Sequence, residues 1–160
     1  MKSIFLFVIG LLFVSLANAQ SSDVESMLGM YIEVKNALVN SDPKKVTEKA
    51  TQLLASINQT NIEKLQSAEK KAFSASKADL IKVAQKISNT SDLEKQRLAF
   101  GEFSEVFWSF IKQAESVSKQ VYYDYCPMKK AYWLSTEESI KNPYYGSKML
   151  TCGKISETKK

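Results

Sequence analysis

The scarcity of helix-breaking residues is the sequence feature that most constrains the fold of this chain. From residue 21 to about residue 118, the 160-residue sequence contains one proline, Pro43, and two glycines, Gly29 and Gly101. Proline and glycine are the residues that most disfavour a helix interior. Apolar residues recur in this segment every three or four positions, which is the spacing of one face of an α-helix. The segment therefore predicts a succession of helices.

Polar breaks between the periodic stretches predict four helices with short connections. The second helix follows SDPKK, in which Ser41 or Asp42 is the expected N-cap and Pro43 lies in the first turn. The fourth follows Ser91-x-x-Glu94, the pattern of a capping box. The expected helical ranges are 23–40, 43–58, 65–87 and 91–111.

The fourth predicted helix is the most apolar, and its aromatic side chains fall on more than one face. A helix of this kind is typically enclosed by its neighbours. A ligand-binding box is the alternative interpretation of the aromatic row. A core is favoured, because no polar residues converge on the row and burial of one Phe contributes about 1.5–3 kcal/mol. The aromatic residues concerned are Phe100, Phe103, Phe107, Trp108 and Phe110.

The character of the sequence changes near Val121. VYYDY favours a β-strand, and Pro127 in the following CPM predicts a turn. Ser135-x-x-Glu138 predicts a short helix that ends at Asn142-Pro143, after which KMLTCG is expected to return beside YYDYC. The fold class expected is therefore mainly α, an antiparallel four-helix bundle followed by a compact, irregular C-terminal segment with short strands and turns.

The N-terminus has the pattern of a cleaved signal peptide. Lys2 precedes the apolar run IFLFVIGLLFVSL, and Ala17-Asn18-Ala19 provides the small residues of a cleavage site. An uncleaved anchor is the alternative, but the run is shorter than the roughly 20 residues of a membrane span. We therefore expect a signal peptide at 1–19 and a single helical domain at 20–160, exported to the periplasm or cell envelope without a stable span.

Charge and composition exclude several classes of function. The formal net charge is +5, but the positive residues are lysines dispersed along the chain apart from Arg97, so a nucleic-acid site is not expected. The sequence contains no histidine, which excludes Ser-His-Asp and Cys-His catalysis and histidine-based zinc or copper(II) sites. No enzymatic activity is predicted.

Two cysteines and two nearby methionines form the candidate site. Cys126 is followed by Met128, and Met149 precedes Cys152, all within the C-terminal segment 121–155. Thiolate and thioether sulfurs suit copper(I), which makes these four residues candidate metal ligands. Two cysteines in an exported domain also commonly form a disulfide, and Cys126–Cys152 is the only pairing available. The residues alone leave both interpretations open.

The same region carries a resemblance to a known family. CPM, AYWLS and IKNPYYGSKMLTCG closely resemble the C-terminal signature of a bacterial exported helical domain of unknown function. QRLAFGEFSEVFWSFIK is similar to the last long helix of that family. The family's domain is also appended to periplasmic adaptor subunits of heavy-metal (copper) efflux pumps. The resemblance implies non-enzymatic handling of copper or a related soft metal, with envelope metal-efflux components as partners.

The resemblance carries over to Cys126, Met128, Met149 and Cys152 as the metal-binding candidates. One difference lies beside them. In the family, an alanine and a glycine-bearing insertion usually separate CPM from YWLS, whereas here Lys129 and Lys130 lead directly to Ala131. The loop beside Met128 is therefore shorter and more positive than the family pattern.

Two functions are expected from these observations. The leading hypothesis is an exported, non-enzymatic domain that binds copper(I) or another soft metal and is accessory to metal efflux or homeostasis. The alternative is a helical module clasped by a Cys126–Cys152 disulfide, which binds a protein partner in the cell envelope. Its binding surface would consist of Tyr122, Trp133, Tyr144 and Tyr145.

Overall fold

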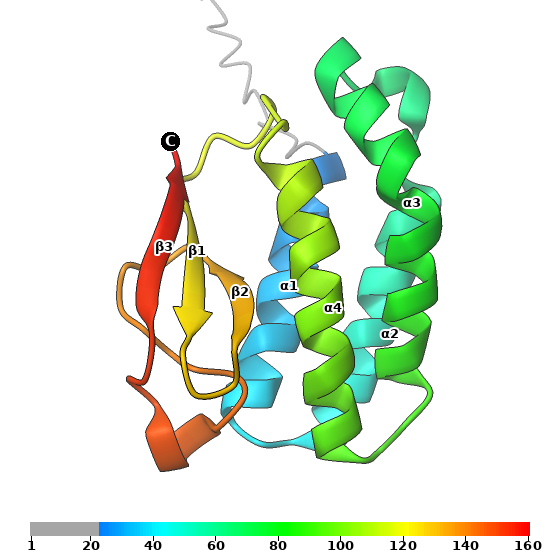
Figure 1. The fold of residues 1–160 in the computed structure, drawn as a ribbon. Coiled ribbons are helices and arrows are strands. Elements are labelled where there is room, and N and C mark those ends of the chain that lie inside the picture. The colour runs from blue at the N-terminus through cyan, green and yellow to red at the C-terminus, as the bar shows by residue number, and fades with distance from the viewer. Residues whose placement is uncertain (1–22) are drawn as a thin grey trace, which may run out of the picture.

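The computed structural model describes residues 23–160, so the predicted signal peptide at 1–19 lies outside the described residues. Four helices are followed by three strands (Figure 1). No helix of the described part is both long enough and apolar enough to cross a membrane. The elements are α1 (Asp23–Val39), α2 (Pro43–Gln59), η1 (Ile62–Lys64), α3 (Ser67–Ser88), α4 (Leu93–Ile111), β1 (Val121–Cys126), β2 (Ala131–Ser135), η2 (Gly146–Met149) and β3 (Lys154–Lys159).

Local capping explains where the helices begin. The Asp42 side chain accepts a hydrogen bond from the Lys45 amide at 3.0 Å, and Pro43 follows it in the first turn, as expected. At the start of α4 the cap is Asp92, which accepts from the amides of Glu94 and Lys95. The predicted cap at Ser91 is therefore wrong by one residue. The carboxylate one position later reaches two free amides and satisfies both.

The core lies between the helices and consists largely of packed aromatic rings. Helices adjacent in sequence pack against each other, α1 on α2, α2 on α3 and α3 on α4. Tyr31 of α1 stacks on Phe100 of α4 with ring centroids 5.0 Å apart, and Phe103 and Phe107 lie next to the same ring. The aromatic row is thus buried, as predicted. Leu98 of the same helix is an exception, because 58% of its surface is exposed.

A small antiparallel sheet follows the helices, with strand order β2-β1-β3. The edge strand β2 packs against α4 and α1, while β1 and then β3 lie farther from the helices (Figure 1). Trp108 of α4 stacks on Tyr123 of β1 at 4.7 Å, and Tyr123 stacks on Tyr132 of β2 at 4.6 Å. The protein is therefore mainly helical and ends in a three-stranded sheet.

The segment between β2 and β3 differs from the prediction in two ways. The predicted helix over Ser135–Glu138 does not form, because Ser135 ends β2 and its hydroxyl makes a local turn with the Glu137 backbone. KMLTCG is not a strand either, because Met149 ends η2 and β3 starts only at Lys154. Serine hydroxyls can bond to the nearby backbone outside helices, which is why the capping pattern was misleading here.

Candidate functional site

The structure brings the two cysteines together at the end of the sheet. Cys126 is the last residue of β1 and is buried. Cys152 is half-buried and lies just before β3, whose first residue, Lys154, is paired with Tyr125. Both cysteines are free, and they lie close enough for Cys126 to raise the pKa of the Cys152 thiol. The predicted proximity of Cys126 and Cys152 is therefore present, although the strand that returns is 154–159 and not KMLTCG.

The environment of Cys152 favours its protonated form. The pKa of this thiol is raised above its ordinary value, first by loss of solvent and then by the charge and hydrogen bond of Cys126. Reactive catalytic cysteines have a lowered pKa, because the thiolate is the nucleophile. The pair is thus unlike a nucleophilic dithiol. Any metal that binds both sulfurs has to displace their protons.

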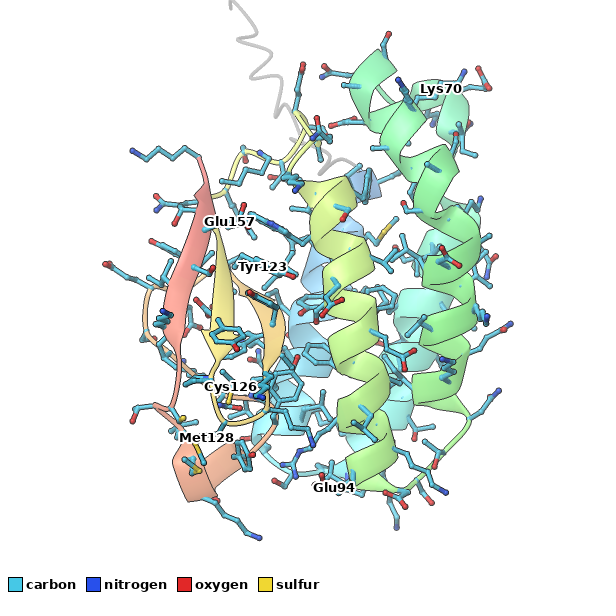
Figure 2. The ribbon with its side chains drawn as sticks, in the orientation of Figure 1. Lys70, Glu94, Tyr123, Cys126, Met128 and Glu157 are labelled. Atoms are coloured by element: carbon cyan, nitrogen blue, oxygen red, sulfur yellow. The ribbon has the colours of Figure 1, made fainter. Side chains whose placement is uncertain are left out.

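The two methionines flank the cysteine pair and face solvent. Met128 lies in the turn between β1 and β2 with 64% of its surface exposed (Figure 2). Met149 ends η2 and is 36% exposed, and its carbonyl oxygen accepts a hydrogen bond from the Cys152 amide at 3.1 Å. Within residues 23–160, no three Cys, Asp or Glu side chains are grouped closely enough to hold a metal. A metal centre here would therefore depend on two thiols with thioether assistance.

The turn after Cys126 is tight and carries positive charge. The Lys130 amide donates to the Cys126 carbonyl at 2.8 Å, and Lys130 adopts a positive φ of 54°. The Lys129 amide donates to the Cys126 Sγ at 3.4 Å. This contact fixes the turn against the Cys126 side chain.

Asn142 holds the segment that carries Cys152, and sequence reasoning treated it only as the end of a helix. Its side chain is buried and donates to the Cys152 carbonyl at 2.6 Å. Its Oδ1 accepts from the amides of Tyr144 and Tyr145, and its own amide donates to the Leu150 carbonyl at 2.8 Å. The available signal was the Asn-Pro step, which is typical of turn initiation.

A buried carboxylate two residues before Cys126 in β1 was also missed. Asp124 of β1 is fully buried, and neither of its side-chain oxygens has a hydrogen-bond partner among the described residues. Burial raises its pKa to about 7, and the positive charge of the buried Lys35 of α1 opposes that shift. Burial in turn lowers the pKa of Lys35. The sequence gives little indication that Asp124 is buried, because a strand with alternating aromatics does not reveal which of its faces a neighbouring helix covers.

The aromatic surface predicted for the alternative function is largely wrong. Trp133 is fully buried and Tyr144 is 1% exposed, because the segment after β2 folds over that face of the sheet. The Tyr144 hydroxyl donates to the Tyr132 carbonyl, and a Cβ on Gly153 would lie 2.7 Å from the Trp133 ring. Only Tyr122 and Tyr145 of the predicted set are half-exposed.

A family comparison concerns the helical part of the chain. The model of a family described as "Protein of unknown function (DUF3347)" matches residues 27–119. The chain belongs to this DUF3347 family. It matches no curated protein and no solved structure. The DUF3347 match ends before β1, so it covers most of α1 and all of α2 to α4 but not the cysteine motifs.

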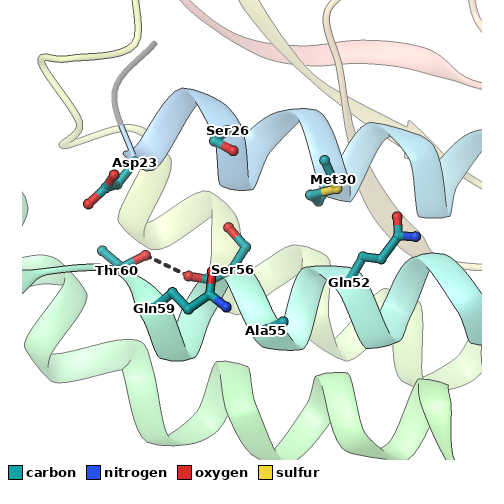
Figure 3. A pocket seen from close by; sticks show the side chains of 8 residues that line it. All are labelled: Asp23, Ser26, Met30, Gln52, Ala55, Ser56, Gln59 and Thr60. Atoms are coloured by element: carbon teal, nitrogen blue, oxygen red, sulfur yellow. Dashed lines mark hydrogen bonds between the residues drawn. The ribbon is translucent and has the colours of Figure 1, made fainter. Parts of the chain in front are cut away.

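The DUF3347 segment contains most of a surface groove between α1 and α2 (Figure 3). The groove has a volume of about 360 Å³ and lies near the N-terminal end of α1. The Thr60 hydroxyl in its wall donates to the Ser56 carbonyl at 2.9 Å. The C-terminal end of α1 instead approaches η2, where the Val39 carbonyl oxygen lies 2.7 Å from the position of a Cβ on Gly146. The groove is thus separate from the sulfur site. Its lining residues are Asp23, Ser26, Met30, Gln52, Ala55, Ser56, Gln59 and Thr60.

Proposed function

We propose that this protein is an exported, non-enzymatic domain that binds copper(I) or another soft metal through Cys126 and Cys152. Met128 and Met149 would supply additional sulfur donors. The proposal includes cleavage of residues 1–19 and a role accessory to metal efflux or homeostasis in the cell envelope. It also includes an antiparallel bundle arrangement of the four helices, which is supported by the packing of each helix on the next in sequence.

The observation that carries the proposal is the contact between the two thiols, beside two exposed thioethers. Cys126 raises the pKa of the Cys152 thiol, although 26 positions separate the two residues in the sequence. Copper(I) prefers soft sulfur ligands and accepts low coordination numbers, so two thiolates suffice as its primary ligands. The raised pKa of Cys152 is compatible with metal binding and disfavours nucleophilic catalysis.

The exposure of the methionines at the site is suited to transfer of the metal ion to a partner protein. Met128 is the most exposed large apolar side chain of the described residues. An exposed thioether can contact a partner's ligand before the buried Cys126 releases the ion. The resemblance to efflux-associated domains supports an envelope efflux component as that partner. No nucleic-acid partner is proposed.

A titration of the reduced protein with copper(I) against a competing chelator tests the proposal. Cys126→Ser and Cys152→Ser should each lower the affinity by about 100-fold or more, since loss of even an outer-shell partner costs about 10- to 100-fold. Met128→Leu should lower it less. Met30→Leu is the matched control, because Met30 lies in the groove between α1 and α2. Unchanged affinity in both serine variants would refute metal binding at this site.

The same thiol contact supports the alternative, in which Cys126 and Cys152 form a disulfide in the envelope. Closing a loop of this length would stabilise the fold by about 3–4 kcal/mol in the chain-entropy model. Intact mass with and without reduction and alkylation distinguishes the two states. A disulfide that resists mild reductant, in protein that retains no metal, favours the alternative.

A further inference from the structure

Arg97, the only arginine of the chain, is buried at the junction of three segments. Its Nε donates to the Pro143 carbonyl at 3.1 Å, in the segment that carries Cys152. Its Nη1 donates to Glu94 at 2.7 Å, and its Nη2 donates to the Ser41 hydroxyl at 3.0 Å. One guanidinium therefore ties α4 to the α1–α2 connection and to the C-terminal segment.

The first branch leads from Arg97 to Cys152. The Pro143 carbonyl held by Arg97 directly follows Asn142 in the chain. The Asn142 side chain donates to the Cys152 carbonyl at 2.6 Å. Close packing supports this branch, because a Cβ on Gly146 would lie 3.4 Å from Nη2 of Arg97. The Cys152 half of the sulfur site is thus held against α4.

The second branch leads from Arg97 to Cys126. Glu94 accepts from Arg97 with one carboxylate oxygen and lies 3.7 Å from the Lys129 ammonium with the other. The Lys129 amide donates to the Cys126 Sγ at 3.4 Å. Glu94 lies at the same end of the molecule as Met128 and Cys126 (Figure 2). The turn that carries Met128 is therefore tied to the same arginine.

We propose that Arg97 is a positioning residue that sets the distance between the Cys126 and Cys152 thiols, so that they act as a pair. This inference deepens the proposed function, with which it shares the premise that the two sulfurs work together, but it does not require a metal. Pairing of Tyr125 with Lys154 brings the two segments side by side, but Cys152 itself lies before β3, in the connection from η2. A shared anchor on a rigid helix fixes both segments relative to the same point.

Arginine is suited to this role and lysine is not. A guanidinium presents several N–H groups in one plane and bonds several acceptors at fixed angles, whereas an ammonium is a point charge on a flexible stem. Arg97→Lys can retain an ion pair with Glu94 but cannot also reach Pro143 and Ser41 in the same geometry. We therefore expect the lysine variant to lie between the wild type and Arg97→Gln.

Two readouts on the full chain test the inference. The first is the equilibrium of the protein dithiol with oxidised glutathione, in which one protein disulfide and two reduced glutathione molecules form. The second is copper(I) affinity against a chelator. The variants are Arg97→Gln, Arg97→Lys and Glu94→Gln. Glu102→Gln is the matched control, because it removes an exposed ion pair of α4 with Lys86 of α3 that does not involve Arg97. Chemical denaturation identifies the conditions under which each variant is folded.

In Arg97→Gln, the equilibrium constant for disulfide formation with glutathione and the association constant for copper(I) should each fall about tenfold or more. Small displacements of paired groups are costly. Glu94→Gln should lower both constants by a smaller factor, and Glu102→Gln should leave both constants unchanged. If folded Arg97→Gln retains both constants, the inference is wrong while cysteine-dependent copper binding can stand. If the wild type binds no copper but Arg97→Gln shifts the glutathione equilibrium, the proposed function fails and the inference stands. If Arg97→Gln does not fold, Glu94→Gln decides, and an unshifted equilibrium in it overturns the inference.

Discussion

The Tyr31 hydroxyl accepts a hydrogen bond from the Leu134 amide at 2.9 Å, across 103 positions of sequence. The same hydroxyl lies 2.7 Å from the Ser104 hydroxyl. One fully buried side chain of α1 thus joins α4 and the edge strand β2. The sheet that carries Cys126 is therefore anchored in the helical core by a polar contact as well as by packing.

Tyr31→Phe should lower the free energy of unfolding by about 1–3 kcal/mol. The substitution keeps the ring but leaves the buried Leu134 amide without its acceptor. Urea denaturation of reduced protein measures the change. Tyr122→Phe is the control, because the Tyr122 hydroxyl makes no hydrogen bond within the described residues 23–160, and it should be near neutral. Equal effects of the two substitutions would contradict the role of the hydrogen bond.

Asp124 should make stability fall as the pH rises. Its pKa is raised from 3.8 to about 7 in the folded protein, mainly by burial. The folded state then binds more protons than the unfolded state between these values, so ionisation of Asp124 progressively destabilises the fold across that window. Compared with Asp124→Asn, the wild type should lose unfolding free energy from pH 3.8 to about pH 7. Urea denaturation at several pH values gives the difference, and parallel curves would contradict a titrating Asp124.

Gly146→Ala should lower the free energy of unfolding by at least about 2 kcal/mol. Gly146 has φ of +56°, and a Cβ there would lie 2.7 Å from the Val39 carbonyl oxygen. Gly29→Ala is the matched control, since it lies in α1 with open space around its Cβ and should gain about 0.5–1 kcal/mol. Thermal and urea unfolding compare the two. Tolerance of alanine at 146 would mean that the segment is not held against the α1–α2 connection.

Cys152 should alkylate more slowly at neutral pH than an unperturbed thiol. Its pKa is raised, so less thiolate is present at a given pH. Mass spectrometry after timed exposure to iodoacetamide, from pH 7 to pH 10, gives the rate profile. Cys126→Ser removes the neighbouring sulfur and should shift the profile to lower pH. A rate that already levels off near neutral pH would contradict the raised pKa of Cys152.

The helices could be predicted closely because their determinants are local. The expected ranges 23–40 and 43–58 correspond to α1 and α2 within one or two residues. Apolar periodicity marks the buried face, and Asp42 and Pro43 mark a start that needs no distant contact. The C-terminal segment was harder. Its strand β3 consists of almost entirely exposed residues, so hydrophobic alternation gives no signal for it.

The sulfur residues of the candidate site could be predicted, but the buried residues around them could not. Cys126 and Cys152 were recognisable as a pair because the chain has no other cysteine. Arg97, Asn142 and Asp124 were not recognisable, because their roles depend on acceptors or burial that distant segments provide. The expected aromatic surface failed for the same reason, since local sequence does not show that a later loop covers Trp133.

The sequence by itself determined the helical order, the absence of histidine chemistry and the presence of two cysteines with two nearby methionines. These properties follow from composition and from interactions within a few residues of each other. Only the tertiary structure decided that the thiols meet, that Asp124 is enclosed and that Arg97 links both halves of the sulfur site. Such contacts join segments that are 26 or more positions apart, and their geometry is fixed by the packing of the sheet on α1 and α4.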